Sequence, residues 1–141
     1  GFVEYERRNE ETGLVNQCWK DSQNSMLFAD GTIARPPIAT CEIQGYVYDA
    51  KRRMARLARE IWADHELARR LEQDAAELRR RVHEAFWVAD AGYYALALDG
   101  DKRQVDSLTS NVGHLLWSGI VDPEPAAQLA RHLMSERLYS G

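Results

Sequence analysis

The chain has no long apolar run, and only two of its 141 residues are cysteines. A membrane-spanning helix needs roughly 18–20 consecutive apolar residues, so the sequence predicts no membrane partner. The N-terminus also lacks the basic-then-apolar pattern of a secretory signal peptide. Two cysteines, Cys18 and Cys41, are too few for a disulfide scaffold. These absences together predict a cytoplasmic protein with free thiols.

Basic charge is not in excess either, because 18 Lys and Arg stand against 22 Asp and Glu, which gives a formal net charge of −4. A function that rests on neutralising phosphates needs the opposite balance, so we expect no nucleic-acid partner. The histidines at positions 65, 83, 114 and 132 show no metal-ligand spacing. Phosphate-binding glycine loops, dinucleotide fingerprints and G-x-S-x-G elbows are also missing. The sequence therefore implies no metal and no other cofactor.

What the chain does have is enough apolar material for one folded domain, since 45% of its residues are hydrophobic. Residues 2–6 alternate apolar and polar side chains, which predicts a half-buried N-terminal strand. Turn-forming residues are dense over residues 9–37 and predict a loop region. Apolar residues then recur three and four positions apart, which predicts a helix over about residues 38–63. Asp64 is expected to cap a second helix that continues to Phe86.

The remainder of the chain predicts a small β-hairpin and two further helices. Gly92 is expected to end the second helix, and residues 93–98 and 104–106 are typical of two strands joined by a turn. A short helix is expected over residues 112–118, and a last one from Pro123. Its buried side is expected to carry Leu129, Leu133 and Leu138 with Ala126, Ala130 and Met134. The predicted fold class is mainly α: helical hairpins with a small β-hairpin and an N-terminal strand.

Three segments hold polar and aromatic residues that helix packing does not explain. In the first, residues 13–22, Trp19, Lys20 and Asp21 stand together with two amides. Sugars stack their C–H faces on aromatic rings and need a few placed donors and acceptors, so this composition indicates a carbohydrate site. A carboxyl group that an indole partly desolvates holds its proton more tightly, which makes Asp21 a candidate general acid. The alternative is that Asp21 caps a short helix over residues 22–28.

The second segment, residues 40–46, opens the first long helix and places Glu42 and Tyr46 on one face, four residues apart. A helix N-terminus can present substrate-binding groups, whereas the ordinary alternative is that Glu42 favours the helix dipole. In the third segment, residues 109–119, Asn111 and His114 lie where a loop becomes a helix and are candidates for binding hydroxyl groups. The alternative there is a structural histidine. Leu116 and Trp117 are expected in the core.

Four stretches of the chain, taken in order, carry a family resemblance. They are residues 16–22 (NQCWKDS), 28–31 (FADG), 41–46 (CEIQGY) and 110–117 (SNVGHLLW). Together they resemble the bacterial glycogen-debranching, amylo-α-1,6-glucosidase-like proteins. The resemblance covers most of the chain and implies an (α/α)6 toroid, in which six inner and six outer helices surround a sugar-binding cavity. In the wider group of toroidal glycosidases, hydrolysis is inverting and uses two carboxyl groups about 6.5–9.5 Å apart.

The resemblance also assigns site residues. The Trp-Lys-Asp-Ser stretch matches the family's general-acid loop, so Asp21 takes that role by resemblance, and Trp19 and Lys20 line the glucose subsite. Further pocket candidates are Gln44, Asn111 and His114. Some relatives carry an acidic residue at the position of Asn24. The implied function is release of glucose from α-1,6 branch points of glycogen-like α-glucans, or from a related α-glucoside, without a cofactor.

The family's general base lies in a part of the toroid that nothing in this sequence matches. With far fewer predicted helices than a toroid has, the chain is expected to be a slice of a larger domain that is inactive alone. It would pair with the rest of the toroid or self-associate through unpaired helix faces. Two other functions stay open: a non-catalytic glucan-binding toroid, and a helical interaction module that uses arginine-rich helix faces. Among substrates, glucosylglycerate, mannosylglycerate and trehalose-like glucosides also stay open.

Overall fold

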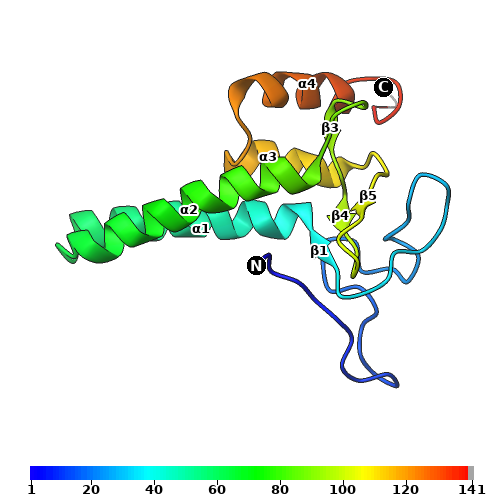
Figure 1. Ribbon diagram of the computed structural model, residues 1–141, viewed down its shortest axis with the longest axis horizontal. Helices are drawn as coiled ribbons and strands as arrows, with labels where there is room; N and C mark the ends of the chain where they lie inside the picture. The colour runs from blue at the N-terminus through cyan, green and yellow to red at the C-terminus, as the bar shows by residue number, and fades with distance from the viewer. Residues whose placement is uncertain (140–141) are drawn as a thin grey trace.

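The computed structural model describes residues 1–139 and has a mainly α-helical fold with a small antiparallel β component. This confirms the fold class predicted from the sequence. A long α1–α2 hairpin extends to one side, and the strands, α3 and α4 gather at its base (Figure 1). The elements follow in this order: β1 (Ala39–Thr40), α1 (Cys41–Glu60), α2 (His65–Phe86), β2 (Trp87–Val88), β3 (Tyr93–Tyr94), β4 (Ala97–Leu98), β5 (Gln104–Val105), the 3-10 helix η1 (Ser110–Val112), α3 (Gly113–Ser118) and α4 (Pro123–Leu133).

The α1–α2 hairpin follows from the apolar spacing of the sequence. The two helices contact each other along the hairpin. Their buried residues include four alanines, Ala55, Ala58, Ala68 and Ala75. Small side chains of this kind let neighbouring helices pack closely. At the tip, Asp64 caps α2, because its Oδ1 accepts a hydrogen bond from the Leu67 backbone N–H at 2.9 Å. The predicted cap is therefore confirmed.

Both long helices are shorter than predicted, because residues at one end of each form a short strand instead. α1 begins at Cys41 rather than near residue 38, because Ala39 and Thr40 pair with β4. α2 ends at Phe86, well before Gly92, because the two residues of β2 pair with β3. Tertiary pairing thus overrides the helical periodicity at these two ends.

The β-strands differ from the predicted pattern. Over residues 2–6 of the described chain, Tyr5 alone pairs, in an isolated bridge with Ile38 through two 2.9 Å backbone hydrogen bonds, so the predicted N-terminal strand is wrong. The predicted hairpin is present between β4 and β5, which pair antiparallel, but residues 93–94 form a separate strand, β3, in the other sheet. β3 pairs with β2, whereas β4 lies between β1 and β5. The chain changes partners at Ala95, whose N–H bonds to the Phe86 carbonyl at 2.7 Å.

The main core lies at the base of the hairpin, where α1, α2, α3, α4 and β3 meet. Its largest fully buried residues are Tyr94, Phe86, Leu98, Leu115 and Leu129. A smaller cluster, which includes Met26, Ile38 and Leu96, holds the N-terminal loop region against the three-stranded sheet. Leu129 is buried as predicted, but Ala130 and Met134 are exposed, contrary to the prediction for the last helix. Among the described residues, no helix has both the length and the apolar character needed to span a membrane.

Candidate functional site

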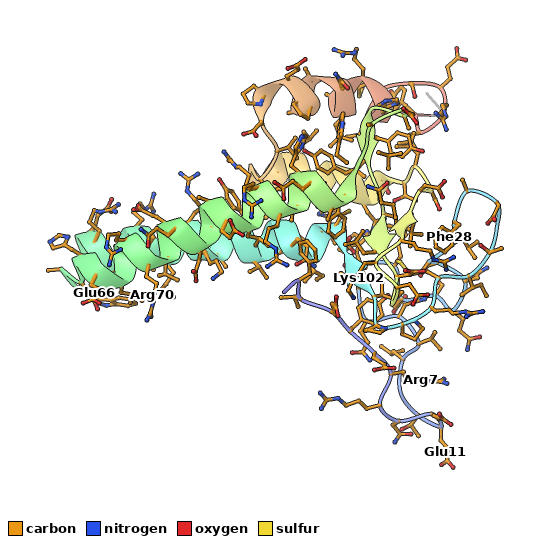
Figure 2. The ribbon with its side chains drawn as sticks, viewed as in Figure 1. Arg7, Glu11, Phe28, Glu66, Arg70 and Lys102 are labelled. Atoms are coloured by element: carbon orange, nitrogen blue, oxygen red, sulfur yellow. The ribbon has the colours of Figure 1, made fainter. Side chains whose placement is uncertain are left out.

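A hollow of about 780 Å³ lies between α1 and the η1–α3 segment at the base of the hairpin. It is lined by Tyr46, Asp49, Ala50 and Arg53 of α1 and by Ser110, Gly113, His114 and Trp117 of η1–α3. A volume of this size suits a small organic ligand. Away from this site, the hairpin carries ordinary surface charge: Glu66 and Arg70 lie at its far end (Figure 2).

Helical spacing explains why these side chains share one hollow. On α1, Tyr46, Ala50 and Arg53 recur at i, i+4 and i+7, which places them on one face. On α3, His114 and Trp117 are three residues apart and likewise share a face. The hollow therefore forms where two short runs of ordinary helical periodicity face each other.

Gly45 brings the two sides of the hollow together. A Cβ atom at this position would lie 2.8 Å from Ser118 Oγ and 3.3 Å from Ser118 Cβ. Both distances are shorter than ordinary van der Waals contact, so a side chain at position 45 would push α3 away from α1. This glycine, one residue before Tyr46, therefore sets the width of the hollow.

Four aromatic rings line or border the hollow. The Tyr46 hydroxyl and His114 Nδ1 are 2.9 Å apart, and the two rings meet edge to face at 5.6 Å. The ring of Trp117 lies 6.3 Å from that of Tyr46, again edge to face. Trp19, from the N-terminal loop, places its ring 5.4 Å from that of His114. Three segments that are distant in the sequence thus supply one aromatic cluster.

The two tryptophans of this cluster are largely exposed, Trp19 by 69% and Trp117 by 70%. An indole that the fold does not bury offers an apolar plane to a ligand. The neighbouring hydroxyl and imidazole can supply hydrogen bonds at the edge of that plane. The hollow thus combines apolar planes with a few placed polar groups, an arrangement typical of sites for small organic ligands.

Asp49 and Arg53 form the charged edge of the hollow. Arg53 Nε lies 2.7 Å from Asp49 Oδ2, in an i, i+4 ion pair. Desolvation and then the nearby charge of Glu42 raise the pKa of Tyr46, so its hydroxyl stays protonated at neutral pH. Among residues 1–139, no three His, Cys, Asp or Glu side chains gather closely enough to hold a metal ion. The chemistry available here is hydrogen bonding and stacking.

The loop that carries Trp19 is held in place by Asn16, which is buried. Its Oδ1 accepts a hydrogen bond from the Tyr5 hydroxyl at 2.9 Å. Its Nδ2 donates to the Ser22 carbonyl at 2.7 Å and to Ser25 Oγ at 3.1 Å. A buried amide with partners on both sides fixes the loop backbone. This anchoring is what positions the Trp19 ring beside the hollow.

Asp21, the predicted general acid, is exposed. Residues 1–139 therefore do not provide the partial desolvation by Trp19 that the prediction assumed, which corrects that premise. The alternative is also wrong, because residues 22–28 form no helix and the Ser25 N–H instead closes a turn to the Ser22 carbonyl at 3.0 Å. Lys20, two residues before Ser22, is half-buried. Asp21 is thus accessible from solvent, two positions after Trp19.

Gln44, a predicted sugar contact, is fully buried and lies outside the hollow. Its Oε1 accepts a hydrogen bond from the Val3 N–H at 3.0 Å, and its Nε2 donates to the Val3 and Thr40 carbonyls at 2.8 and 3.1 Å. Because the backbone engages both ends of the amide, Gln44 anchors the N-terminal segment to α1, which corrects the prediction. Asn111, also a predicted contact, is fully buried beside Ser110, which lines the hollow.

Asp49, Arg53 and Trp117 line the hollow but were not predicted as residues of the site. Trp117 was expected in the core, and that prediction is wrong because its ring faces the hollow. The available signals were the spacing of three between His114 and Trp117 and of seven between Tyr46 and Arg53. The same spacings occur on any amphipathic helix, so they did not separate a site residue from a core or surface one.

Comparisons with known proteins give no family assignment, because no protein-family model matches the chain and no curated protein matches it. The case for a function therefore depends on the geometry of the hollow and on the motifs of the chain itself.

Proposed function

We propose that this chain is part of the catalytic domain of an inverting glycoside hydrolase that releases glucose from α-1,6 branch points of glycogen-like α-glucans or from a related α-glucoside. The observation that carries the proposal is the gathering of Trp19, Tyr46, His114 and Trp117 around one hollow. The motif resemblance supports the same class, because three of its four stretches supply these rings. These four aromatic residues come from three separate segments and meet at one hollow, where two of them stay exposed.

In this proposal the rings bind a glucose unit, and Asp21 protonates the glycosidic oxygen as it leaves. The exposed planes of Trp19 and Trp117 pack against C–H faces of the sugar. The Tyr46 hydroxyl and the His114 imidazole hydrogen-bond to sugar hydroxyls. A bound glucan would exclude water from the loop that carries Asp21 and so supply the desolvation absent from the free chain. We assign the base that activates water on the opposite face to no residue of this chain.

Exposed apolar side chains on the outer half of the hairpin support the proposal that further protein packs against it. Met54, Leu57, Ile61 and Trp62 are all at least 41% exposed. Several large apolar side chains exposed within nine residues are typical of an interface. We propose that the rest of the toroid, or a second copy of the chain, covers it. Cys18 and Cys41 are free thiols, which suits the reducing cytoplasm in which we place the enzyme.

Sugar binding in the hollow is tested with the chain as it stands, by calorimetric titration with isomaltose and maltose. Saturable binding is expected. Trp117→Ala and Trp19→Ala should each weaken it severalfold to about tenfold, because a stacking plane is lost. Trp62→Ala is the matched control, since Trp62 is also an exposed tryptophan but lies at the far end of the hairpin. No binding at millimolar sugar, or an equal loss in Trp62→Ala, contradicts the proposal.

Hydrolysis is tested in the natural polypeptide that contains these residues. Asp21→Asn is expected to lower kcat by about 10²–10⁴-fold, because a general acid is lost. Asp101→Asn, which changes an exposed carboxyl between β4 and β5, should leave kcat unchanged. If Asp21→Asn lowers kcat by only about threefold or less, the loss is far smaller than that of a general acid, and Asp21 is removed from the mechanism.

A non-catalytic glucan-binding role is the second candidate, and the exposure of Asp21 in the free chain is the observation that favours it. Asn24, which stands where some relatives in the resembled family carry an acidic residue, is exposed in the same loop. Isomaltose binding without any release of glucose, unaffected by Asp21→Asn, would favour this role over catalysis. Asn24→Asp then tests whether one added carboxyl creates hydrolysis.

The arginine-rich faces offer less support for a helical interaction module. Seven of the nine arginines of the hairpin are exposed, and four of them pair with carboxylates of the same hairpin. Arg59 lies 2.7 Å from Glu72, and Arg80 lies 2.6 Å from Glu84. Charges that neutralise each other in this way solvate a helix face and leave little net potential for a partner.

A further inference from the structure

Glu42 stands out among the polar groups of the chain, because it is 0% exposed in the first turn of α1. Within residues 1–139 its Oε1 has no hydrogen-bond partner, and its Oε2 is approached by the Cys41 thiol at 3.7 Å. Burying a carboxylate with so few partners destabilises a fold. A group that lowers stability and is nevertheless buried indicates a function.

Two more buried polar atoms at this end of α1 lack a partner in the described chain: Thr40 Oγ1 and Asn111 Nδ2. Thr40 is 1% exposed and Asn111 is 0% exposed. Thr40 directly precedes α1, and Asn111 belongs to η1, which contacts α1. A carboxylate, an amide N–H and a hydroxyl together can accept from and donate to the same ligand group.

These atoms lie one helical turn below the aromatic hollow. Glu42 precedes Tyr46 by four residues on α1, and Asn111 precedes His114 by three. Both helical segments begin at the end of the hairpin that meets the strands, and they run in the same direction (Figure 1). Because Tyr46 and His114 are hydrogen-bonded, one turn back along each segment brings Glu42 and Asn111 to the same level. Ser110, beside Asn111, lines the hollow.

The Glu42 carboxyl also faces the N-terminal loop. Desolvation, followed by the charge of Glu42, raises the pKa of Cys41. The same charge adds to the raised pKa values of Cys18 and Tyr5, for which desolvation is again the main cause. The charge therefore acts on groups of the loop as well as on groups of α1. Glu42 is thus close enough to Cys18 and Tyr5 for its charge to act on both.

We propose that Glu42, Asn111 and Thr40 form a polar subsite that binds one hydroxyl group of the sugar held in the hollow. Glu42 Oε1 accepts a hydrogen bond from the sugar hydroxyl, and Asn111 Nδ2 donates one to the hydroxyl oxygen. Thr40 Oγ1 is a second donor or acceptor for the same hydroxyl. A neutral hydroxyl fits best, because the carboxylate repels anions and the amide N–H repels cations. The inference rests on the proposed function, since it needs a sugar in the hollow.

A ligand reaches Glu42 only when a neighbouring segment moves, because the carboxyl is closed off in the free chain. Residues 17–22 are the segment that can move, since four of these six residues are exposed and Asn16 is their main buried anchor. Displacing the half-buried Cys18 side chain opens the way toward Glu42, while Trp19 stays beside His114. Sugar binding is therefore coupled to a movement of this loop.

The first test compares methyl α-glucoside with its four monodeoxy analogues on three proteins: the unsubstituted chain, Glu42→Gln and Glu60→Gln. Glu42→Gln should weaken binding of the parent glucoside about tenfold, because a charged acceptor becomes a neutral one. One deoxy analogue should bind the unsubstituted chain about as weakly as the parent glucoside binds Glu42→Gln. The affinity for that analogue should not fall further in Glu42→Gln, because the hydroxyl that contacts Glu42 is already missing. Glu60→Gln changes an exposed glutamate of the same helix and should alter no affinity.

The second test measures thermal unfolding without sugar. Glu42→Met is expected to raise Tm by about 3 °C or more, because an apolar side chain replaces a buried carboxylate that lacks partners. A fall in Tm would show that the carboxyl is structural and would overturn the inference whatever the sugar data. If Trp117→Ala weakens binding but Glu42→Gln does not, the subsite is overturned and the proposed function stands. If the unsubstituted chain binds no glucoside, the proposed function fails and the subsite with it.

Discussion

The outer half of the α1–α2 hairpin and its base differ in how their polar side chains are surrounded. In the outer half, charged side chains face solvent and pair with each other, as in Arg56 with Glu60 on α1 and Arg59 with Glu72 between the helices. At the base, the same helix is enclosed by other elements and carries Glu42 and Gln44 with no exposed surface. One helix thus passes from a solvated, self-neutralised surface into a packed interior.

The difference shows where a function can lie. In the outer half, charged residues such as Arg56 and Arg59 pair with carboxylates of the same hairpin, and the exposed apolar residues are the surface that we propose further protein covers. Within residues 1–139, the base leaves buried polar atoms of Glu42 and Asn111 without partners, and it leaves two tryptophan rings exposed. Natural sequences break the rules of polar satisfaction and apolar burial mainly at functional sites. Substitutions at the base should therefore change stability and binding together, and those in the outer half should change little of either.

The largest loss of stability is expected at Phe86, at the base of the hairpin. Phe86 is fully buried, and its ring meets that of Phe2 edge to face at 5.2 Å. Phe86→Ala should lower the free energy of unfolding by about 3–5 kcal/mol, measured by urea denaturation. Met54→Ala, on an exposed part of α1, should change it by about 0.5 kcal/mol or less. Equal losses at the two positions would erase the distinction between base and outer half.

Gly45→Ala comes next, with an expected loss of about 1–3 kcal/mol, because the added Cβ would lie 2.8 Å from Ser118 Oγ. The same change should weaken isomaltose binding, since it widens the hollow. In a Ser118→Ala background the loss should shrink, because the closest atom is gone. Urea denaturation and calorimetry measure the two effects. A gain in stability, as expected from the helix propensity of alanine alone, would show that α3 is free to move.

At the tip of the hairpin, Asp64→Ala should cost about 1 kcal/mol, because the Leu67 N–H loses its cap. Loss of helical circular dichroism on urea titration measures this cost. Sugar affinity should not change, since the cap lies at the opposite end of the hairpin from the hollow. A weaker affinity in Asp64→Ala would show that the two ends are coupled and would contradict the comparison.

The parts of the fold that sequence reasoning predicted well are those that near neighbours decide. Helical periodicity and the Asp64 cap depend on residues within one turn, so the α1–α2 hairpin was predictable. The strands are two residues long and depend on distant partners, such as Ala39 with Leu98. A period-2 pattern over residues 2–6 does not reveal that Tyr5 alone finds a partner, at Ile38. Pairing across long separations is not encoded locally.

The site shows the same limit at the level of side chains. Trp19 and His114 were candidates because their surroundings were unusually polar, and the structure brings them together. Gln44 was a candidate through the family resemblance, and the sequence did not reveal that its partner is the Val3 backbone, 41 residues away. Trp117 was expected in the core because the apolar spacing of a short helix does not show which of its faces is buried. The composition of the sequence indicated which segments border the hollow. Which side chains of those segments face the hollow depends on the tertiary fold.

The smallest effect is expected at the ion pair between Arg59 and Glu72 in the outer half. Arg59 Nη2 lies 2.7 Å from both carboxylate oxygens of Glu72, and each side chain is 45% exposed. A double-mutant cycle with Arg59→Ala and Glu72→Ala should give a coupling below about 1 kcal/mol, because water screens the pair. High salt should reduce that coupling further. A coupling as large as the loss at Phe86 would mean that specific contacts, rather than solvation, hold the outer half, and the contrast with the base would fail.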